Sequence, residues 1–348
     1  MRFYTKQHKY YCGIDLHART MFICILDQAG KTLFHRNRKA SPEAFLKVIK
    51  PYREDIVVAV ECVFLWYWLA DVCARENIPF VLGHALYMKA IHGGKSKNDR
   101  IDSQKIALLL RGGTLPISYV YPREMRSTRD LLRRRNYLTR KRAELLTHIQ
   151  NTNSQYNLPA PPKGITSKVN REGVAEHFPN PSVSKSIEVD LQLVDFYDGL
   201  LRDLELCILR TARVDDPNVL YLLQTIAGVG KILALVLLYE IHEINRFPRV
   251  QDFVSYCRLV KCSRESAGKK SGTKNTKIGN VNLKWAFSEA AVCFLRVNER
   301  AQSYHMRLVS KHGKGKALAI LAHKLGRAVY LMLKRKEAFD INIFLSRS

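Results

Sequence analysis

The sequence predicts an α/β domain at the N-terminus and helical regions over the rest of the chain. Three observations predict this fold class. Residues 10–40 alternate short apolar, β-branched runs with a turn at residues 27–30, and residues 55–60 form the continuous apolar run of a buried strand. Beyond residue 111 the apolar residues recur at helical spacing instead. A chain of 348 residues also exceeds one ordinary core, so we expect two or three domains.

The N-terminal region contains alternating signals for strands and helices. Residues 10–40 predict two or three antiparallel strands. Ser41 followed by Pro42 marks the start of a helix, because serine is a preferred N-cap and proline suits the first helical position. The next elements are a strand over residues 55–60 that ends at Glu61, a helical segment over 64–77 and a strand over 78–83. Strands followed by helices, with crossovers of this length, predict a sheet covered on both faces.

The remaining regions are predicted to be helical. Residues 123–150 combine a helical period with a dense positive face, and a second helix is expected over residues 183–213. Stretches rich in proline and serine break the chain between them, so the two helices predict a helical hairpin or a coiled coil that oligomerises. From Pro217 onward the pattern is mostly α-helical. We therefore predict three domains, over residues 1–122, 123–214 and 215–348.

The charge balance predicts a polyanionic partner. Lysine and arginine number 57 against 31 aspartates and glutamates, which gives a net charge of +26 spread along the chain. No apolar run is long enough to span a bilayer, so nucleic acid is favoured over a membrane. The N-terminus lacks an apolar signal region, which favours a cytoplasmic, nucleoid-associated location. Eight scattered cysteines without a C-x-x-C pair predict neither a zinc site nor a disulfide framework.

Four acidic residues are candidates for a metal site. Asp15 lies within an apolar strand pattern, Glu61 closes the buried strand, and Asp99 and Asp102 stand three residues apart in a basic run that opens a helix. Two carboxylates on one helix face repel each other unless a cation or a proton sits between them. If the four converge at the carboxyl edge of the sheet, they suit two hard cations with phosphate oxygens completing the coordination.

Each acid also has a structural alternative. Taken as a pair alone, Asp99 and Asp102 are better explained as a helix N-cap and a first-turn acid that offsets the helix dipole, and their combination with Asp15 and Glu61 is what favours a metal site. Glu61 would serve as an ordinary polar residue at a strand end. Asp15 lies in an apolar strand pattern, where burial of a carboxylate costs free energy, so a functional role is favoured for it. The histidines near these positions are expected to be structural or to face phosphate; they are His17, His84 and His92.

Basic clusters are the candidates for nucleic-acid binding. The densest cluster is predicted to contact phosphates, although a charge run can also be only a solvated face; it comprises Arg133, Arg134, Arg135, Arg140, Lys141 and Arg142. Tyr119, Tyr121 and Tyr137 lie near it in the sequence and would either stack on unpaired bases or pack in a core. Gly228 and Gly230 before Lys231 lack the spacing of a nucleotide P-loop and predict a tight turn between two helices. The backbone N–H groups of this turn would either contact a nucleic-acid phosphate or serve only the packing of the helices.

A serine-containing segment has the composition of an anion-binding loop. The sequence RESAGKKSGTKNTK supplies small residues for close backbone approach and several cations for phosphate. The lysines that could clamp a phosphodiester are Lys269, Lys270, Lys274 and Lys277. A serine hydroxyl needs a metal or a base to become a nucleophile, and composition alone leaves Ser263, Ser266 and Ser271 equally eligible.

The chain resembles the insertion-sequence-110 family of transposases. The resemblance rests on YCGIDLHARTMFICILDQAGK around Asp15, VECVFLWYW around Glu61, NDRID at residues 98–102, LQTIAGVGKILALVLLYEI, and the span from Leu259 to Phe287. Many relatives have small residues after the glutamate, where this chain has VFLWYW, so local packing is expected to differ there. The resemblance implies an RNase H-like (RuvC-like) N-terminal domain whose Asp-Glu-Asp-Asp quartet binds magnesium, and it places the family's serine at Ser266.

The resemblance also implies an activity and partners. A transposase of this kind is a DNA recombinase of a mobile element, in which Ser266 attacks a DNA phosphodiester and forms a covalent phosphoserine intermediate. Mg²⁺ would be held by Asp15, Glu61, Asp99 and Asp102, and ATP is not expected because the covalent step conserves bond energy. The expected partners are target and donor DNA, a structured noncoding guide RNA (a bridge RNA), and further copies of the chain in a homodimer or homotetramer.

Two other functions are compatible with the same residues. A RuvC-like, metal-dependent nuclease that hydrolyses branched DNA would use the carboxylates with a metal-bound water and would need no serine. A nucleic-acid-binding protein without activity would keep the basic clusters and use the acids only structurally. A covalent protein–DNA adduct distinguishes the recombinase from both.

Overall fold

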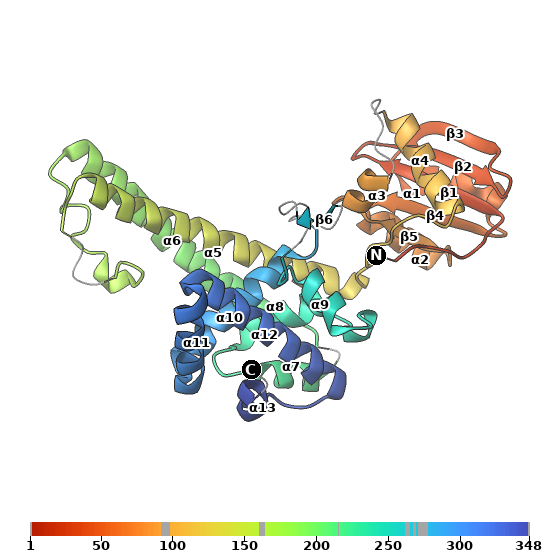
Figure 1. Ribbon diagram of the computed structural model, residues 1–348. Coiled ribbons are helices and arrows are strands. Elements are labelled where there is room, and N and C mark those ends of the chain that lie inside the picture. The colour runs from red at the N-terminus through yellow and green to blue at the C-terminus, as the bar shows by residue number, and fades with distance from the viewer. Residues whose placement is uncertain are drawn as a thin grey trace. The chain divides into compact units, whose positions relative to one another are not determined.

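The computed structural model describes residues 2–91, 98–159, 164–214, 216–261, 265–266, 269–270 and 278–346. The chain divides into two compact units, Met1–Glu124 and Met125–Ser348 (Figure 1). The first unit is α/β and the second is mainly helical, so the predicted fold class is confirmed at this level.

The first unit is built on a mixed five-stranded sheet. Its strands are β1 Tyr10–Leu16, β2 Thr20–Asp27, β3 Thr32–Lys39, β4 Ile56–Glu61 and β5 Phe80–Gly83, in the spatial order β3-β2-β1-β4-β5. The first three strands pair antiparallel, as the alternating pattern and the turn before Gly30 predict. β4 and β5 run parallel to β1, each after a helical crossover. The carboxyl ends of β1, β4 and β5 therefore lie at one edge of the sheet.

Helices cover both faces of this sheet. They are α1 Pro42–Ile49, α2 Tyr67–Arg75, α3 Ala85–Ile91 and α4 Asp99–Arg111, with a short 3₁₀ helix η1 over Lys50–Tyr52. Ile14 of β1 belongs to a core with α1 and α2, whereas Tyr11 of β1 belongs to a second core with α4. Side chains of a strand alternate between faces, so the odd-numbered residues of β1 point toward α4. The predicted two-sided covering is therefore present.

Gly13 allows α4 to lie directly on β1. A Cβ atom at this position would be 2.3 Å from the backbone nitrogen of Ala107 and 2.4 Å from the carbonyl oxygen of Ser103. Any larger residue would push α4 off the strand, because real Cβ contacts are never this short. The close approach fixes the beginning of α4, Asp99, beside the carboxyl end of β1.

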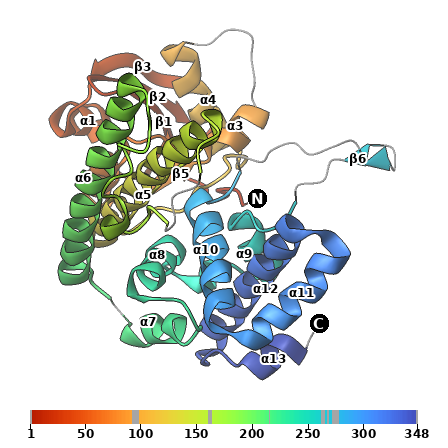
Figure 2. The same ribbon diagram turned by 90° about the vertical axis from the view of Figure 1, so that its left-hand side faces the viewer.

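The second unit consists of a long helical hairpin and a helical core. The hairpin is α5 Arg123–Gln155 and α6 Pro181–Thr211, which lie side by side in Figures 1 and 2. The other elements are η2 Lys168–Asn170, α7 Pro217–Gln224, α8 Lys231–Ile241, η3 Ile244–Arg246, α9 Val250–Tyr256, β6 Glu265–Ser266, β7 Lys269–Lys270, α10 Val281–Val297, α11 Glu299–His312, α12 Lys314–Arg335 and α13 Ile341–Ser346. Ile149 of α5 packs against Ile187 and Val194 of α6 in a small core of the hairpin. The predicted hairpin is therefore formed within one chain.

The main core of the second unit surrounds α8. This helix is buried on every side from Leu233 to Ile241, which explains its lack of a polar face. Gly228 forms the turn before it at φ +83°, and a Cβ atom there would be 2.6 Å from the backbone of Cys293 in α10. The predicted tight turn is present, and the glycine is needed for packing against α10. No helix among the described residues has both the length and the apolar character that a bilayer span requires.

Candidate functional site

The site begins at the carboxyl end of β1. Asp15 lies on the face that α4 covers, four residues after the buried Tyr11, and only 19% of its side chain is exposed. The parallel register joins Ile14 to Val60, so the next residue of each strand, Asp15 and Glu61, stands at the same edge. Chain direction and side-chain alternation thus place both acids at one corner of the sheet.

The first turn of α4 brings the other two acids to this corner. The side chain of Asn98 caps the helix, since its Oδ1 accepts a hydrogen bond from the backbone N–H of Ile101 at 2.8 Å. Asp99 is therefore the first helical residue, and its alternative role as the N-cap is wrong. Asp102 follows within the first turns of α4, as a first-turn acid. Both carboxylates lie at the positive end of the helix dipole.

The helix start is also tied to the sheet. Nε2 of His35 in β3 lies 2.9 Å from the carbonyl oxygen of Arg100, and the hydroxyl of Ser103 donates to the same oxygen at 2.9 Å. Together with the close packing over Gly13, these bonds fix where the carboxylates of α4 point. The acids are thus held on two rigid elements, a strand end and a capped helix, and not on a loop.

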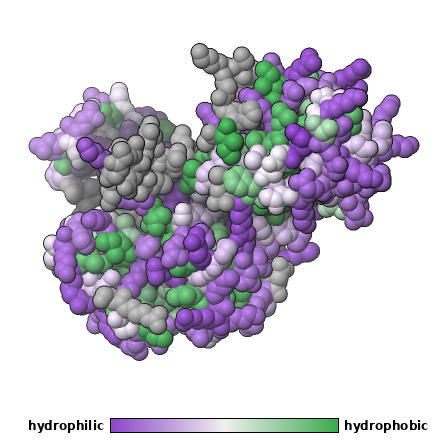
Figure 3. Space-filling model, turned by 45° about the vertical axis from the view of Figure 1, so that its right-hand side comes forward, coloured by the Kyte–Doolittle hydropathy of each residue, from purple (hydrophilic) through white to green (hydrophobic). Residues whose placement is uncertain are grey.

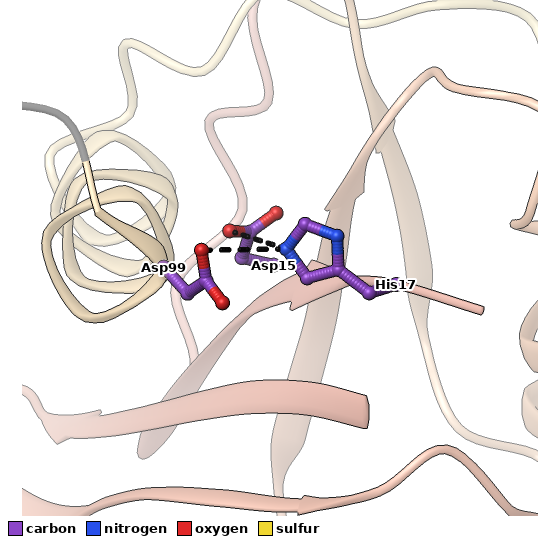
Figure 4. Close-up of side chains that lie close together, drawn as sticks. All are labelled: Asp15, His17 and Asp99. Atoms are coloured by element: carbon purple, nitrogen blue, oxygen red, sulfur yellow. Dashed lines mark hydrogen bonds and ion pairs between the residues drawn. The ribbon is translucent and has the colours of Figure 1, made fainter. Parts of the chain in front are cut away.

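Asp15, His17 and Asp99 converge on one point (Figure 4). Nε2 of His17 lies 3.3 Å from Oδ2 of Asp15 and 3.5 Å from Oδ1 of Asp99, so one imidazole nitrogen contacts both carboxylates. One donor atom from each of the three residues lies within 4.8 Å of the others. His17 belongs to this group, whereas its sequence context gave only a structural or phosphate-facing role.

The other two predicted acids lie at the border of the group. Asp102 is half-buried, its Oδ1 lies 3.7 Å from Nζ of Lys105, and its charge acts on Asp15. Glu61 is half-buried at the end of β4, paired in register with Gly83 of β5, and its carboxylate is not among the three clustered ligands. The structure therefore brings Asp15 and Asp99 together and leaves Asp102 and Glu61 beside them.

The electrostatics of the group favour an added cation. Burial raises the pKa of Asp15, the charges of Asp99 and Asp102 raise it further, and His17 opposes the shift. Among the described residues, no arginine forms an ion pair with Asp15, Asp99 or Asp102. Although the chain has 57 basic residues, the ion pairs that these three acids form within the described part of the chain are to one imidazole and one lysine.

The donor atoms fit a divalent ion. Carboxylate oxygens are the ligands of hard cations, and an imidazole nitrogen is accepted by transition ions such as Mn²⁺. Asp15 and Asp99 supply oxygens from the end of β1 and the start of α4, and His17 would either turn away or join them as a ligand. A bound cation would remove the repulsion that raises the pKa of Asp15. The group therefore has the chemistry of a metal site.

The segment after Glu61 exposes apolar side chains. The side chain of Phe64 is 85% exposed and that of Val63 is 38% exposed, whereas Trp66 is buried against the sheet. The backbone N–H of Cys62 donates to the carbonyl of Gly83 at 2.8 Å, which holds this turn to β5. The bulky residues after Glu61 thus divide between the core and the surface.

The basic cluster of α5 divides into two kinds of residue. Three arginines form ion pairs within the second unit: Arg133 with Glu240 at 2.6 Å, Arg135 with Glu205 at 2.5 Å, and Arg142 with Asp198 at 2.5 Å. Arg134 is exposed over the ring of Tyr137, Arg140 is exposed, and Lys141 pairs with its helical neighbour Glu144. The first group fastens α5 to α6 and α8, so the second group is better placed for phosphates.

The tyrosines near this cluster also divide into a packed residue, Tyr121, and an exposed one, Tyr137. Tyr121 is buried and packs edge-to-face against Tyr119 with ring centroids 4.9 Å apart, which assigns it to packing. Tyr137 is 41% exposed, and the guanidinium of Arg134 lies 5.2 Å from its ring centroid.

Hydrophilic residues predominate on the face drawn in Figure 3, with smaller hydrophobic patches among them.

The serine segment is described only in part. Ser266 lies in β6, where it pairs with Lys269 of β7 in a two-stranded ladder, and Lys269 is exposed. Lys270 follows in β7, while Ser263, Ser271, Lys274 and Lys277 lie outside the described residues. The end of the segment is anchored: Nε of Arg258 donates to the carbonyls of Ile278 and Gly279.

Asn280 completes this anchor. Its backbone N–H donates to the carbonyl of Tyr256 at 2.6 Å, its Oδ1 caps α10, and its Nδ2 donates to Glu240 at 2.8 Å. Glu240 is the buried carboxylate of α8 that also receives Arg129 and Arg133 from α5. The residue that follows the serine segment is therefore bonded to α8 directly and is linked to α5 through Glu240.

Comparisons with known proteins place these features in a family. Residues 12–157 match the family model of the IS110-type DEDD transposases, and residues 220–306 match the model described as Transposase IS116/IS110/IS902 family. The chain is also 22% identical over 343 residues to the transposase for insertion sequence element IS1111A of Coxiella burnetii (strain RSA 493 / Nine Mile phase I), an alignment that covers 94% of this chain and 90% of that protein. The first match contains the acids of β1, β4 and α4, and the second contains β6. The chain belongs to the IS110 family of transposases.

Proposed function

We propose that this transposase cuts and rejoins DNA with a metal site formed by Asp15, Glu61, Asp99 and Asp102 and a serine nucleophile, Ser266. The observation that carries the proposal is the group of Asp15, His17 and Asp99, whose donor atoms lie within 4.8 Å of one another with no arginine paired to either acid among the described residues. An RNase H-like classification of the first unit is supported by the sheet order β3-β2-β1-β4-β5, with β2 antiparallel to its neighbours.

Each residue would have a distinct task. Asp15 and Asp99 would hold the divalent ion, which we take to be Mg²⁺, and Glu61 and Asp102 would complete its surroundings from the neighbouring strand end and from α4. When bound, such an ion supplies Lewis-acid stabilisation of a phosphodiester. His17 could accept a proton near the reacting phosphate, because it already lies within 3.5 Å of both carboxylates.

The serine step exchanges one phosphoester bond for another. The Ser266 oxygen bonds to phosphorus, the bond from phosphorus to the leaving DNA oxygen breaks, the hydroxyl proton passes to a base, and the leaving oxygen takes up a proton. Because a phosphodiester is retained, strands can be resealed without ATP. Lys269 and Lys270 of β7 are close in sequence and register, and they would contact the phosphate.

The partners follow from charge. A net charge of +26 suits backbone contacts to DNA and to a guide RNA, with target and donor sequences chosen by base pairing. Arg134, Arg140 and Lys141 are our candidates for phosphate contacts on α5, because the remaining three basic residues of the cluster are engaged by carboxylates of α6 and α8. Two duplexes must be held together, so we propose a homodimer or homotetramer.

A covalent-adduct assay tests the proposal. The protein is incubated with DNA of the element's end, target DNA, the noncoding RNA of the element and Mg²⁺, then denatured, and DNA that migrates with protein is measured. We expect an adduct that Ser266→Ala removes and that Ser263→Ala and Ser271→Ala retain. Omitting the RNA should reduce the amount of adduct that forms on target DNA complementary to that RNA.

The other outcomes separate the alternatives. DNA that is cut without an adduct would replace the recombinase with a metal-dependent nuclease, which the acid group supports without any serine. Binding without cleavage, unchanged in Asp15→Asn, would leave only a nucleic-acid-binding protein. An adduct that moves to another serine would keep the mechanism and reject Ser266.

A further inference from the structure

The second unit contains a cavity of about 390 Å³ that the proposed recombination chemistry does not use. It lies among α11, α12, α13 and the segment before α13, which group together in Figure 2. All of its lining residues except Tyr304 lie beyond residue 306, where the second family match ends. A cavity of this size falls within the range of about 300 to 1,000 Å³ that is typical of small-ligand sites.

The walls of the cavity combine aliphatic and aromatic side chains. Ile320 and Leu331 of α12 and Ile343 of α13 supply aliphatic surface, and Tyr304, Phe339 and Phe344 supply rings. The rings of Phe339 and Phe344 lie 5.2 Å apart, and Phe344 also packs edge-to-face on Phe294 at 5.6 Å. These contacts make the aromatic wall part of the packed core, so it is preformed and suits a flat, apolar ligand.

One face of α12 adds positive charge to the same cavity. His323, Lys324 and Arg327 lie on consecutive turns and all line it. Among the described residues, neither His323 nor Arg327 forms an ion pair with a carboxylate. Nζ of Lys324 lies 4.8 Å from the ring centroid of Tyr304 and 5.2 Å from that of Phe344, so the cation rests on the aromatic wall.

The two acids of the lining have partners in the cavity wall, where Arg335 adds a further positive charge. Oδ1 of Asp340 accepts hydrogen bonds from the backbone of Asn342 at 2.6 Å and Ile343 at 3.2 Å, at the start of α13. Glu337 lies 3.9 Å from Arg335. Burial lowers the pKa of Lys324, and burial followed by the charge of Arg327 lowers that of His323. The positive charge of this face therefore comes from Lys324 and Arg327, and His323 offers a neutral imidazole that can donate a hydrogen bond to an anion.

We propose that this cavity binds a nucleotide, with the base against the aromatic and aliphatic walls and the phosphate at His323, Lys324 and Arg327. The rings favour a flat heterocycle over a flexible chain, and the cationic face requires an anion. A nucleotide combines both properties in one molecule. The nucleotide comes either from the cellular pool or from an unpaired position of a nucleic-acid strand, and the site is independent of the metal group and of Ser266.

Fluorescence of 2-aminopurine tests this binding with the full-length protein. The probes are the free deoxynucleoside monophosphate of 2-aminopurine and a single-stranded DNA of about ten nucleotides that carries it once. We expect stacking in the cavity to quench the probe. Arg327→Ala should weaken its binding about tenfold, the loss of one charge-assisted contact. Lys316→Ala is the matched control, because it removes one charge from α12 outside the lining, and it should change binding by less than about twofold.

A second variant tests the apolar part of the cavity. Ile343 is 54% exposed at the cavity, so Ile343→Glu should leave the fold intact while its negative charge repels the phosphate of a probe that binds there. If these variants weaken the binding of the single-stranded probe only, the bound nucleotide belongs to a nucleic-acid strand. If they weaken the binding of the free nucleotide as strongly, it comes from the cellular nucleotide pool. Equal effects of Arg327→Ala and Lys316→Ala, or displacement of the probe by decanoate as well as by AMP, would overturn the assignment.

Discussion

Asp15 in the first unit and Glu240 in the second are both carboxylates set among apolar elements, but their surroundings differ. Glu240 accepts hydrogen bonds from Arg129, Arg133 and Asn280, and these bonds together with the two positive charges outweigh its burial, so that its pKa lies below the usual range. Asp15 has a half-exposed histidine and two further aspartates nearby, and burial raises its pKa.

The difference indicates what each carboxylate is for. The chain has arginines in excess and places two of them on the carboxylate that organises the helical core. It places none on Asp15, Asp99 or Asp102 among the described residues, although the repulsion there costs stability. A structural acid is neutralised by the protein itself, whereas under our proposal the acids of the first unit would be neutralised by a cation from solution. The following experiments test that contrast.

Asp15→Asn should have the largest effect on activity. It keeps the shape of the side chain and removes its charge, so we expect strand cleavage to fall by more than about a thousandfold, which corresponds to about 4 kcal/mol of barrier. Asp99→Asn and Asp102→Asn should also abolish cleavage while DNA and RNA binding are retained. The measurements are cleavage rate and binding affinity, with Glu54→Gln as an exposed control in the same unit. Parallel loss of binding and cleavage would mean that the acids only stabilise the fold.

Glu240→Gln should show the opposite profile. It leaves Arg129 and Arg133 facing an uncharged amide in the core, and breaking a buried ion pair costs roughly 3 to 5 kcal/mol, with the lower end expected because Arg133 is partly exposed. Asp15→Asn should leave the free energy of unfolding unchanged or raise it, since it removes repulsion. Hydrogen exchange resolves the two units separately. If Glu240→Gln proves neutral for the second unit, the contrast between the two acids fails.

Divalent cations should stabilise the first unit only. At a concentration a hundredfold above the dissociation constant, a single bound ion adds about 2.7 kcal/mol to the free energy of unfolding. The gain should disappear in Asp15→Asn and Asp99→Asn and persist in Glu240→Gln. Hydrogen exchange with and without Mg²⁺ or Mn²⁺ measures it. Equal protection in the wild type and in Asp15→Asn would show that the ion binds elsewhere.

The two acids should also respond to pH with opposite signs. The pKa of Glu240 is lowered from an ordinary value of 4.5, so its contribution to stability is present above that value and is lost as the pH falls through the lowered pKa. The pKa of Asp15 is raised from 3.8, so its ionised form destabilises the first unit at neutral pH, and protonation relieves this as the pH falls through the raised pKa. Exchange rates of each unit during acid titration, compared with Asp15→Asn and Glu240→Gln, measure the two trends. Identical trends in both units would contradict the assignment.

Local sequence signals predicted the elements better than their environments. The strand alternation, the Ser41 and Pro42 helix start and the acidic helix opening all correspond to observed elements, because each depends on neighbours in the chain. Pairing partners could not be predicted in this way. Nothing near Arg133 in the sequence indicates that Glu240, 107 residues away, engages it, so the whole cluster was assigned to phosphate.

The candidate site shows the same limit at closer range. Asp15 and Asp99 were predicted from residue type and strand direction, but the contact of His17 with Asp99 depends on how closely α4 packs on β1. That close approach depends on Gly13, whose missing side chain carries no chemical signal of its own. The capping role of Asn98 was missed because the neighbouring Asp99 is an equally good cap by type.

Asn98→Ala should have the smallest effect and the most specific one. Loss of the cap should destabilise the first unit by about 1 kcal/mol, because the N–H of Ile101 loses its partner at 2.8 Å. The first turn of α4 would then fray, and Asp99 would lose its fixed position. We therefore expect the cation affinity to fall even under conditions in which the rest of the first unit stays folded. Asn98→Asp is the matched control, since it restores the cap and adds a negative charge at the helix start. Cation titrations of the three proteins, followed by hydrogen exchange of α4, measure the effect. Equal cation affinity in Asn98→Ala and the wild type would show that Asp15 and His17 bind the ion without help from the helix.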